Sequence, residues 1–470
     1  MAKVETLAAQ EQSSSVKKML RRGGSISFLI NSSGMALALL MQVMLARMLG
    51  AAAYGTYAFV STVVTFLVFP TKLGFDTSIV RLVASYRAMN EWGFIKGLLR
   101  RANQIGMALS MTAMILGAVY LIFSSDSMTT ERVVTYAAGL ATIPLLTLAT
   151  LRQSVLQALK DVLFSQMPEK IVRPIITMAI LACWIGLFGN EADAGVAMIS
   201  FAAAVAISWV IGAVVLRKRI GSQIEAVEPR YDTRSWTKLS VSLMLNAGMY
   251  LILGQLGVLM MGMMHSETES GLFSAAVRLA TLAAFALTAV NMTAAPMLSE
   301  LYATGKRKQL QHVCQTSGFS GFVFAAMLMV AFAAGGKLLL GLFGAEFRAS
   351  YWPMLIMTFG QVVNAYCGQN GMMATMTGRQ NALTKALIVS TILNIVLNVA
   401  LIPLIGMIGA AIATTVGLVC WNVIMVVFVY RKMGILTVAW LPKRAWNRLL
   451  EAAPVPSVSG SETVQSGKEG

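Results

Sequence analysis

Charged residues are scarce in this sequence. Only 12% of its 470 residues are Asp, Glu, Lys or Arg, whereas 57% are hydrophobic. Soluble domains carry about 25% charged residues, so this chain lacks the polar surface that a water-soluble fold of its size needs. The composition excludes a soluble globular protein and indicates an integral membrane protein.

Residues typical of metal sites and enzymes are also rare. The two histidines, His265 and His312, have no partners at metal-ligand spacing, and the sequence contains no G-x-x-x-x-G-K-[ST] phosphate loop. The four cysteines lie in or beside apolar runs and form no external pairs: Cys183, Cys314, Cys367 and Cys420. We therefore expect no metal or other cofactor, no ATP hydrolysis, and a protein that is not an enzyme.

The sequence instead has long apolar runs. A helix needs about 20 apolar residues to cross a bilayer, and twelve runs approach that length, six on each side of a basic linker. They fall at about 25–46, 56–78, 104–124, 133–152, 171–189, 194–216, 239–263, 271–298, 314–335, 351–374, 383–404 and 407–430. This pattern predicts an all-α integral membrane protein with about twelve transmembrane helices in two six-helix bundles.

The same pattern divides the chain into five parts. We expect a cytoplasmic N-terminal tail, two bundles joined by a basic cytoplasmic linker, and a cytoplasmic, partly disordered C-terminal tail rich in Pro, Ser, Gly and Glu. The corresponding ranges are 1–24, 25–216, 217–238, 239–430 and 431–470.

A weak internal repeat supports two related bundles. In the first half, Gly50 and Gly55 are expected to bracket a tight turn, because glycine enters positive-φ backbone at low cost. A similar string, from His265 to Ala276, contains Gly271 followed by an aromatic residue. We expect each string to form the external corner of a helical hairpin.

The distribution of basic residues predicts the topology. If the N-terminus is cytoplasmic, most of the 37 Lys and Arg residues lie on cytoplasmic segments, and this set includes Arg152, Lys170 and Arg173. The positive-inside rule then places both termini in the cytoplasm. The net charge of +17 is mainly a topology signal, and we expect no nucleic-acid partner.

Several motifs, in this order, resemble the polysaccharide biosynthesis flippase family. That family belongs to a superfamily with multidrug and toxin extrusion antiporters and lipid II flippases. The motifs are Leu45-Ala-Arg-Met-Leu-Gly-x3-Tyr-Gly-x-Tyr, Gly74-Phe-Asp-Thr-Ser-Ile-Val-Arg, Gly271-Leu-Phe-Ser-Ala-Ala-x-Arg-Leu, Ala295-Pro-Met-Leu-Ser-Glu-Leu-Tyr, Leu342-Phe-Gly-Ala-Glu-Phe and Met376-Thr-Gly-Arg-Gln-Asn.

The resemblance implies two bundles around a central cavity that work by alternating access. It also implies an undecaprenyl-pyrophosphate-linked oligosaccharide as substrate, moved across the bacterial cytoplasmic (inner) membrane for lipopolysaccharide or exopolysaccharide synthesis. The implied partners are this lipid-linked oligosaccharide, the lipid bilayer, and a polysaccharide polymerase with its co-polymerase.

A flippase for such a substrate needs a polar, preferably cationic cavity. Arg278 is the preferred candidate, because a guanidinium grips phosphate oxygens through a planar fork, although a role in binding a structural partner remains open. Lys72 would instead pair with Asp76 at i, i+4 or extend to the membrane surface. The remaining candidates for substrate binding are Arg47 and the amides Asn246, Gln255, Asn291 and Asn364. Each amide is individually more typical of a contact between helices.

Two other functions stay open. A cation-coupled multidrug antiporter of the same superfamily would be expected to place Asp or Glu inside its bundles, yet only Asp76 approaches a predicted span. A non-transporting scaffold of a polysaccharide assembly complex would not need a continuous polar cavity. The intramembrane basic residues therefore favour an anionic substrate.

Overall fold

The computed structural model describes residues 2–159, 161–189, 192–225 and 227–439, and no strand occurs among them. The expected C-terminal tail lies outside these residues from position 440 onward. The first half of the chain forms α1 (Ala2–Thr71), α2 (Phe75–Ala88), α3 (Trp92–Ser124), η1 (Ser125–Ser127), α4 (Thr130–Ala158), α5 (Val162–Met167), the π-helical segment η2 (Pro168–Val172), α6 (Arg173–Phe188) and α7 (Ala194–Glu225).

The second half is built in the same way. It forms α8 (Thr233–Met264), α9 (Glu267–Leu282), α10 (Phe285–Ala303), α11 (Arg307–Gly341), η3 (Glu346–Ser350), α12 (Tyr351–Cys367), α13 (Asn370–Met376) and α14 (Gln380–Met433). Several starts are capped by short polar side chains: Thr129, Asp161, Asp232 and Ser266 each accept a hydrogen bond from a backbone N–H of the following first turn.

Eight of the described helices are long and apolar enough to cross a membrane, so the protein is an all-α, multi-pass membrane protein. The helical ranges α1 and α14 each contain two helices that meet at a backbone break. The breaks lie at Gly50 (φ 72°) and at Ile405–Gly406 (φ −136° and 54°). A total of twelve spans would require the shorter helices α9, α10 and α12 to take part in crossing the membrane as well. The count of twelve therefore stays a prediction.

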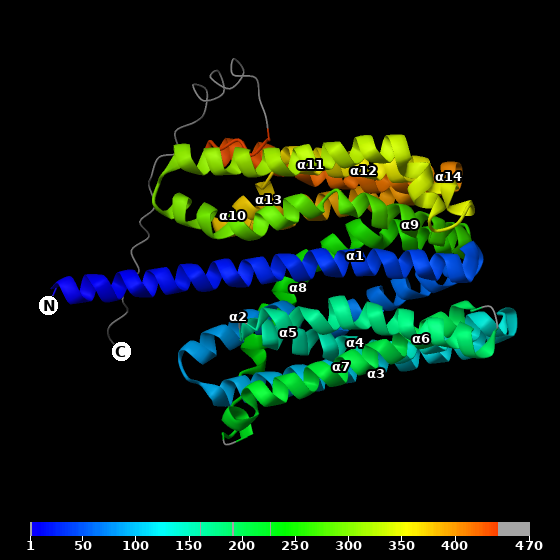
Figure 1. Ribbon diagram of the computed structural model, residues 1–470, viewed down its shortest axis with the longest axis horizontal. Helices are drawn as coiled ribbons and strands as arrows, with labels where there is room; N and C mark the ends of the chain where they lie inside the picture. Colours follow the sequence, from blue (N-terminus) through cyan, green and yellow to red (C-terminus); the bar gives the residue numbers. More distant parts are fainter. Residues whose placement is uncertain (1, 160, 190–191, 226, 440–470) are drawn as a thin grey trace, which may run out of the picture.

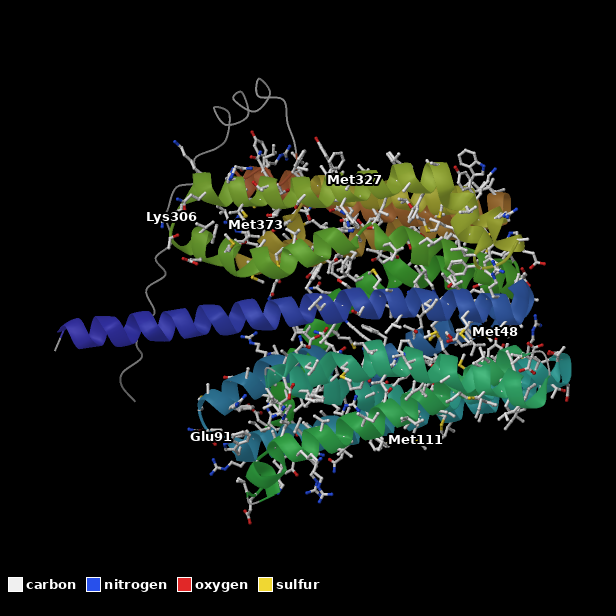
Figure 2. The ribbon with its side chains drawn as sticks, viewed as in Figure 1. Met48, Glu91, Met111, Lys306, Met327 and Met373 are labelled. Atoms are coloured by element: carbon white, nitrogen blue, oxygen red, sulfur yellow. The ribbon has the colours of Figure 1, made fainter. Side chains whose placement is uncertain are left out.

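The helices form two groups with α1 running between them. In Figure 1, α1 (blue) has α9 to α14 on one side and α3 to α7 on the other. Large apolar side chains cover the outer faces: Met111 and Met327 lie on opposite sides of the molecule (Figure 2) and are 38% and 58% exposed. An exposed apolar surface of this kind suits contact with lipid.

The chain's turns define two ends of the molecule. We call the end that holds Gly50, His265 and Gly406 the corner end, and the end that holds residues 227–232 the linker end. At the corner end, one apolar core contains side chains of both halves, among them Tyr54, Phe273 and Phe347. At the linker end, the buried side chains form two separate clusters, one mainly from each half. The two halves are therefore joined most tightly at the corner end.

Gly55 does not form the turn expected from the sequence. It lies inside α1, where a Cβ atom would be 2.3 Å from the carbonyl oxygen of Glu267 in α9. Gly271 is its counterpart, since a Cβ atom there would lie 2.5 Å from the Cα atom of Gly55. The two glycines of the repeat thus allow α1 and α9 to touch backbone to backbone, and only Gly50 acts as a turn residue.

Candidate substrate cavity between the two halves

A cavity lies between α1 of the first half and α8 and α9 of the second. Its volume is about 210 Å³, and its polar lining comes from Gln255, Ser274, Arg278 and Thr281. Met35 and Ala38 of α1 form part of the opposite wall. Two of the residues predicted from the sequence, Gln255 and Arg278, are therefore brought together here.

A second cavity of about 410 Å³ adjoins the first, with Met35, Ala38 and Thr281 lining both. Its polar residues include Asn31 of α1 and Lys170 of η2. Arg278 and Lys170 thus contribute one cation from each half to a shared space. No acidic residue lines either cavity among the residues that the structure describes.

Arg278 lies deep in this space. It is eleven residues beyond the start of α9, which places it about 17 Å from that helix end at a rise of 1.5 Å per residue. Its guanidinium lies close to the Tyr54 hydroxyl, and its charge also acts on Tyr57; both tyrosines belong to α1. Its Nε is buried without a hydrogen-bond partner. A guanidinium with an unsatisfied donor next to a cavity is suited to binding an anion.

Lys170 was missed by the sequence analysis, which assigned it to a cytoplasmic loop. In the structure it lies within the π-helical segment η2, and its Nζ donates to Asn31 Oδ1 and, at 3.4 Å, to Gln166 Oε1. Gly34 makes room for it, because a Cβ atom there would lie 2.7 Å from the Lys170 Cβ. The neighbouring Pro168 was the available sign that this segment is an irregular part of a membrane helix.

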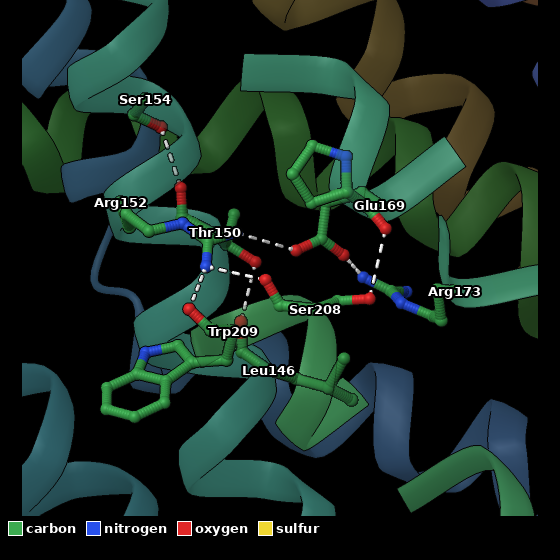
Figure 3. Close-up of polar contacts among 9 residues, drawn as sticks. Leu146, Thr150, Arg152, Ser154, Glu169, Arg173, Ser208 and Trp209 are labelled. Carbon is green, nitrogen blue, oxygen red and sulfur yellow. Dashed lines mark hydrogen bonds and ion pairs between the residues drawn. The ribbon is translucent and has the colours of Figure 1, made fainter. Parts of the chain in front are cut away.

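A buried ionic cluster lies beside this cavity wall, inside the first half (Figure 3). Glu169 pairs with Arg152 at 3.3 Å and with Arg173, its i+4 neighbour. Arg152 also donates from Nη1 to the carbonyl oxygens of Ser208 and Trp209, at 3.0 and 2.5 Å. Two cations and one carboxylate leave this cluster with a net charge of +1.

The cluster corrects two expectations. Arg152 and Arg173 are not loop residues; their side chains are 5% and 20% exposed inside the helices. Glu169, whose side chain is 10% exposed, shows that the expectation of no carboxylate inside a bundle was also wrong. The assignment failed because apolar runs were ended at the first charged residues, whereas the helices continue and the opposite charges compensate one another.

The other predicted site residues lie elsewhere. Lys72 forms the expected i, i+4 ion pair with Asp76, at 3.0 Å. Arg47 is exposed at the corner end and donates to the carbonyl oxygens of Gly341 and Leu342, so it links the two halves.

The three remaining amides belong to the second half. Asn246 accepts a hydrogen bond from Thr384 at 2.7 Å. Asn364 lines a separate cavity of about 250 Å³, which shares Thr281 with the central cavities. The Oδ1 atom of Asn291 is buried without a partner.

The protein is thus an all-α membrane protein whose two halves pack around a cationic cavity. Two solved structures share this fold. One is an inward-facing multidrug resistance transporter of the MATE family and MOP superfamily, with a TM-score of 0.67, 12% identity, and coverage of 84% of this chain and 93% of that one. The other is the lipid II flippase MurJ in an inward closed conformation, with a TM-score of 0.67, 13% identity and 90% coverage of each chain.

The family described as polysaccharide biosynthesis protein matches residues 20–302, and the chain belongs to it. Two archaeal proteins also match. An uncharacterized membrane protein of Methanocaldococcus jannaschii is 27% identical over 36% of each chain. A probable low-salt glycan biosynthesis flippase, Agl15 of Haloferax volcanii, is 24% identical over 33% of this chain and 34% of its own. The chain thus spans about a third of the length of the curated relatives it matches. Agl15 and the two structural neighbours are named as flippases or transporters.

Proposed function

We propose that this protein is a flippase that moves a lipid-linked oligosaccharide, carried on undecaprenyl pyrophosphate, across the bacterial cytoplasmic membrane by alternating access. The observation that carries this proposal is the pair of adjoining cavities, which have Arg278 on one side, Lys170 on the other, and no acidic residue among the described residues that line them. A diphosphate that leaves water needs cationic hydrogen-bond donors in place of its hydration shell, and an arginine fork supplies two parallel hydrogen bonds. Membership of a polysaccharide biosynthesis family supports a sugar cargo.

Cavity size supports a mechanism in which the two halves move. Volumes of about 210 and 410 Å³ suit a diphosphate and an adjacent sugar rather than a whole oligosaccharide. The polyprenyl tail can stay in the bilayer while the polar head passes between the halves. The halves must therefore part further during transport, which is the hinge-like motion that two separately packed groups of helices allow.

The contacts at the corner end support a state that is closed on that side. Glu267 of α9 accepts hydrogen bonds from Thr56 (2.6 Å) and Tyr136 (3.2 Å) of the first half, and forms an ion pair with Arg132 at 3.2 Å. Together with the backbone contact between Gly55 and Gly271, these contacts close the corner end.

We place the linker end in the cytoplasm, because the basic loops, the start of α1 and the end of α14 belong to that end. Reporter fusions within residues 265–270 should then report an external location, and fusions within 305–310 a cytoplasmic one. A cytoplasmic result for 265–270 would reject the orientation and the twelve-span topology together.

The cavity is tested by reconstituting purified protein into vesicles and measuring translocation of a lipid-linked oligosaccharide. Arg278→Ala should insert and fold but lose at least tenfold in rate, and Arg278→Lys should recover part of it because charge survives without the fork. Arg307→Ala, which removes an exposed arginine at the start of α11, is the matched control. Normal transport by a well-folded Arg278→Ala would exclude this residue as the phosphate contact.

A cellular test separates the proposal from its alternatives. Deleting the gene should leave lipid-linked repeat units on the inner leaflet while exported polysaccharide falls. Normal export combined with greater sensitivity to cationic drugs would instead favour an antiporter, and normal lipid translocation with failed assembly would favour a scaffold. The polymerase and co-polymerase partners remain predictions.

A further inference from the structure

A further, larger cavity opens on the outer surface of the first half, away from the space between the halves. It lies at the linker end, where α4 packs against both α3 and α7, and its volume is about 870 Å³. Met107 of α3, which is 39% exposed, lies at its open side. The proposed cargo pathway does not use this cavity.

The lining of this cavity has a polar end and an apolar end. Along α3, Arg100, Asn103 and Gln104 lie nearer the linker end than Met107 does. Along α7, which runs toward the linker end, Leu216 precedes Arg217. Ile220 and Gly221 of α7 also line the cavity beyond Arg217, so the separation is one of α3: its polar groups lie toward the linker end, and Met107 and Ala108 lie toward the middle of the molecule. This is the polarity of a phospholipid in the adjacent leaflet.

The depth of the polar end also suits a lipid phosphate. A helix of 33 residues such as α3 is about 50 Å long, whereas the hydrocarbon core is about 30 Å thick. About 10 Å of helix thus extends beyond the core at each end. Arg100 lies eight residues into α3, Arg217 eight residues before the end of α7, and Arg152 six residues before the end of α4. Arg100 and Arg217 thus lie about 12 Å from their helix ends, near the boundary with the headgroups. The Arg152 guanidinium lies deeper, beside Gly212 of α7.

Arg152 provides the decisive buried group. It lines the floor of the cavity, is 6% exposed, and its Nε is buried without a hydrogen-bond partner. Gly212 leaves space for this guanidinium, since a Cβ atom there would lie 2.1 Å from the Arg152 Cζ. Its carboxylate partner, Glu169, is shared with Arg173, so one positive charge remains uncompensated beside the cavity.

We propose that this cavity binds an anionic phospholipid of the cytoplasmic leaflet. The phosphate lies among Arg100, Arg152 and Arg217, and an acyl chain covers Met107 and Leu216. Charge decides the occupant: among the residues that the structure describes, three arginines and no acidic residue line the cavity, and basic pockets between helices on this side of a membrane select anionic headgroups. The inference uses the orientation proposed above but is independent of the cargo.

The test uses the purified full chain in detergent, with phosphatidylglycerol as the probe and phosphatidylcholine for comparison. Native mass spectrometry should show one phosphatidylglycerol that survives activation, and this lipid should raise the unfolding temperature more than phosphatidylcholine does. The double variant Arg100→Gln/Arg217→Gln should weaken this binding at least tenfold. The control Arg81→Gln/Arg234→Gln removes two exposed arginines outside the cavity and should bind normally.

A second pair of variants tests the apolar part without changing charge. Met107→Trp should fill the cavity and displace the lipid, whereas Met111→Trp, one turn farther along α3, should not. Equal binding of both phospholipids, or equal binding by all four variants, would show only non-specific lipid around the protein and would overturn the proposal. Displacement by undecaprenyl phosphate, with no preference for phosphatidylglycerol, would also overturn it and assign the cavity to the cargo's lipid.

Discussion

Replacing Gly271 with alanine should prevent the corner end from closing. The new Cβ atom would lie 2.5 Å from the Cα atom of Gly55, whereas ordinary contacts begin at 3.4 Å. The obstacle is backbone rather than a mobile side chain, so α1 and α9 must separate by about 1 Å in close-packed surroundings. Overpacking of this kind costs about 1–3 kcal/mol.

This cost falls on the state in which the two halves touch at the corner end. A state that is open at this end does not need the contact, so the equilibrium between the two states should shift toward it. A difference of 1–3 kcal/mol corresponds to about a 5- to 150-fold change in their ratio. Transport should fall, because alternating access needs both states to be populated.

The shift can be measured by cysteine labelling. Thr281 lines both central cavities, so Thr281→Cys, in a chain whose own cysteines are replaced by alanine, reports access to them. In intact cells, Gly271→Ala should increase its labelling by a membrane-impermeant maleimide, and Gly55→Ala should act similarly.

The matched control is Gly335→Ala in α11, where a Cβ atom would meet nothing within 4 Å. It should change neither labelling nor transport. If Gly271→Ala folds normally and labels and transports like this control, the corner-end contact is not a gate.

Three further changes test other parts of the structure. Glu169→Gln leaves Arg152 and Arg173 buried without their shared carboxylate and should lower the free energy of unfolding by about 3–5 kcal/mol. The measurement is thermal stability in detergent, and unchanged stability would show that the cluster is not a buried ion pair. Lys170→Ala should preserve folding but reduce translocation in reconstituted vesicles, and recovery in Lys170→Arg would show that the charge matters. Glu267→Ala removes the hydrogen bonds and the ion pair to α1 and α4. It should increase the external labelling of Thr281→Cys, as Gly271→Ala does, and a decrease would contradict the closure proposed for the corner end.

The membrane class could be predicted from the sequence, because hydropathy is a property of composition and run length. Low charge and long apolar runs require helices that satisfy their own backbone hydrogen bonds in lipid. The motifs around Gly50 and Gly271 also pointed to the family to which the chain belongs. The ion pair between Lys72 and Asp76 followed from helical spacing alone, since residues four apart share a helix face.

The tertiary structure decided which charges face the interior. Arg278 was identifiable because it interrupts an apolar run, but Lys170 and the cluster of Glu169 with Arg152 and Arg173 looked like loop residues. Their burial depends on partners from other helices: Asn31 for Lys170, and the carbonyl groups of α7 for Arg152. No pattern within one segment encodes such partners. Gly55 shows the same limit, because a glycine that permits a turn and one that permits two helices to touch are identical in sequence. Only the packing of α1 against α9 distinguishes them.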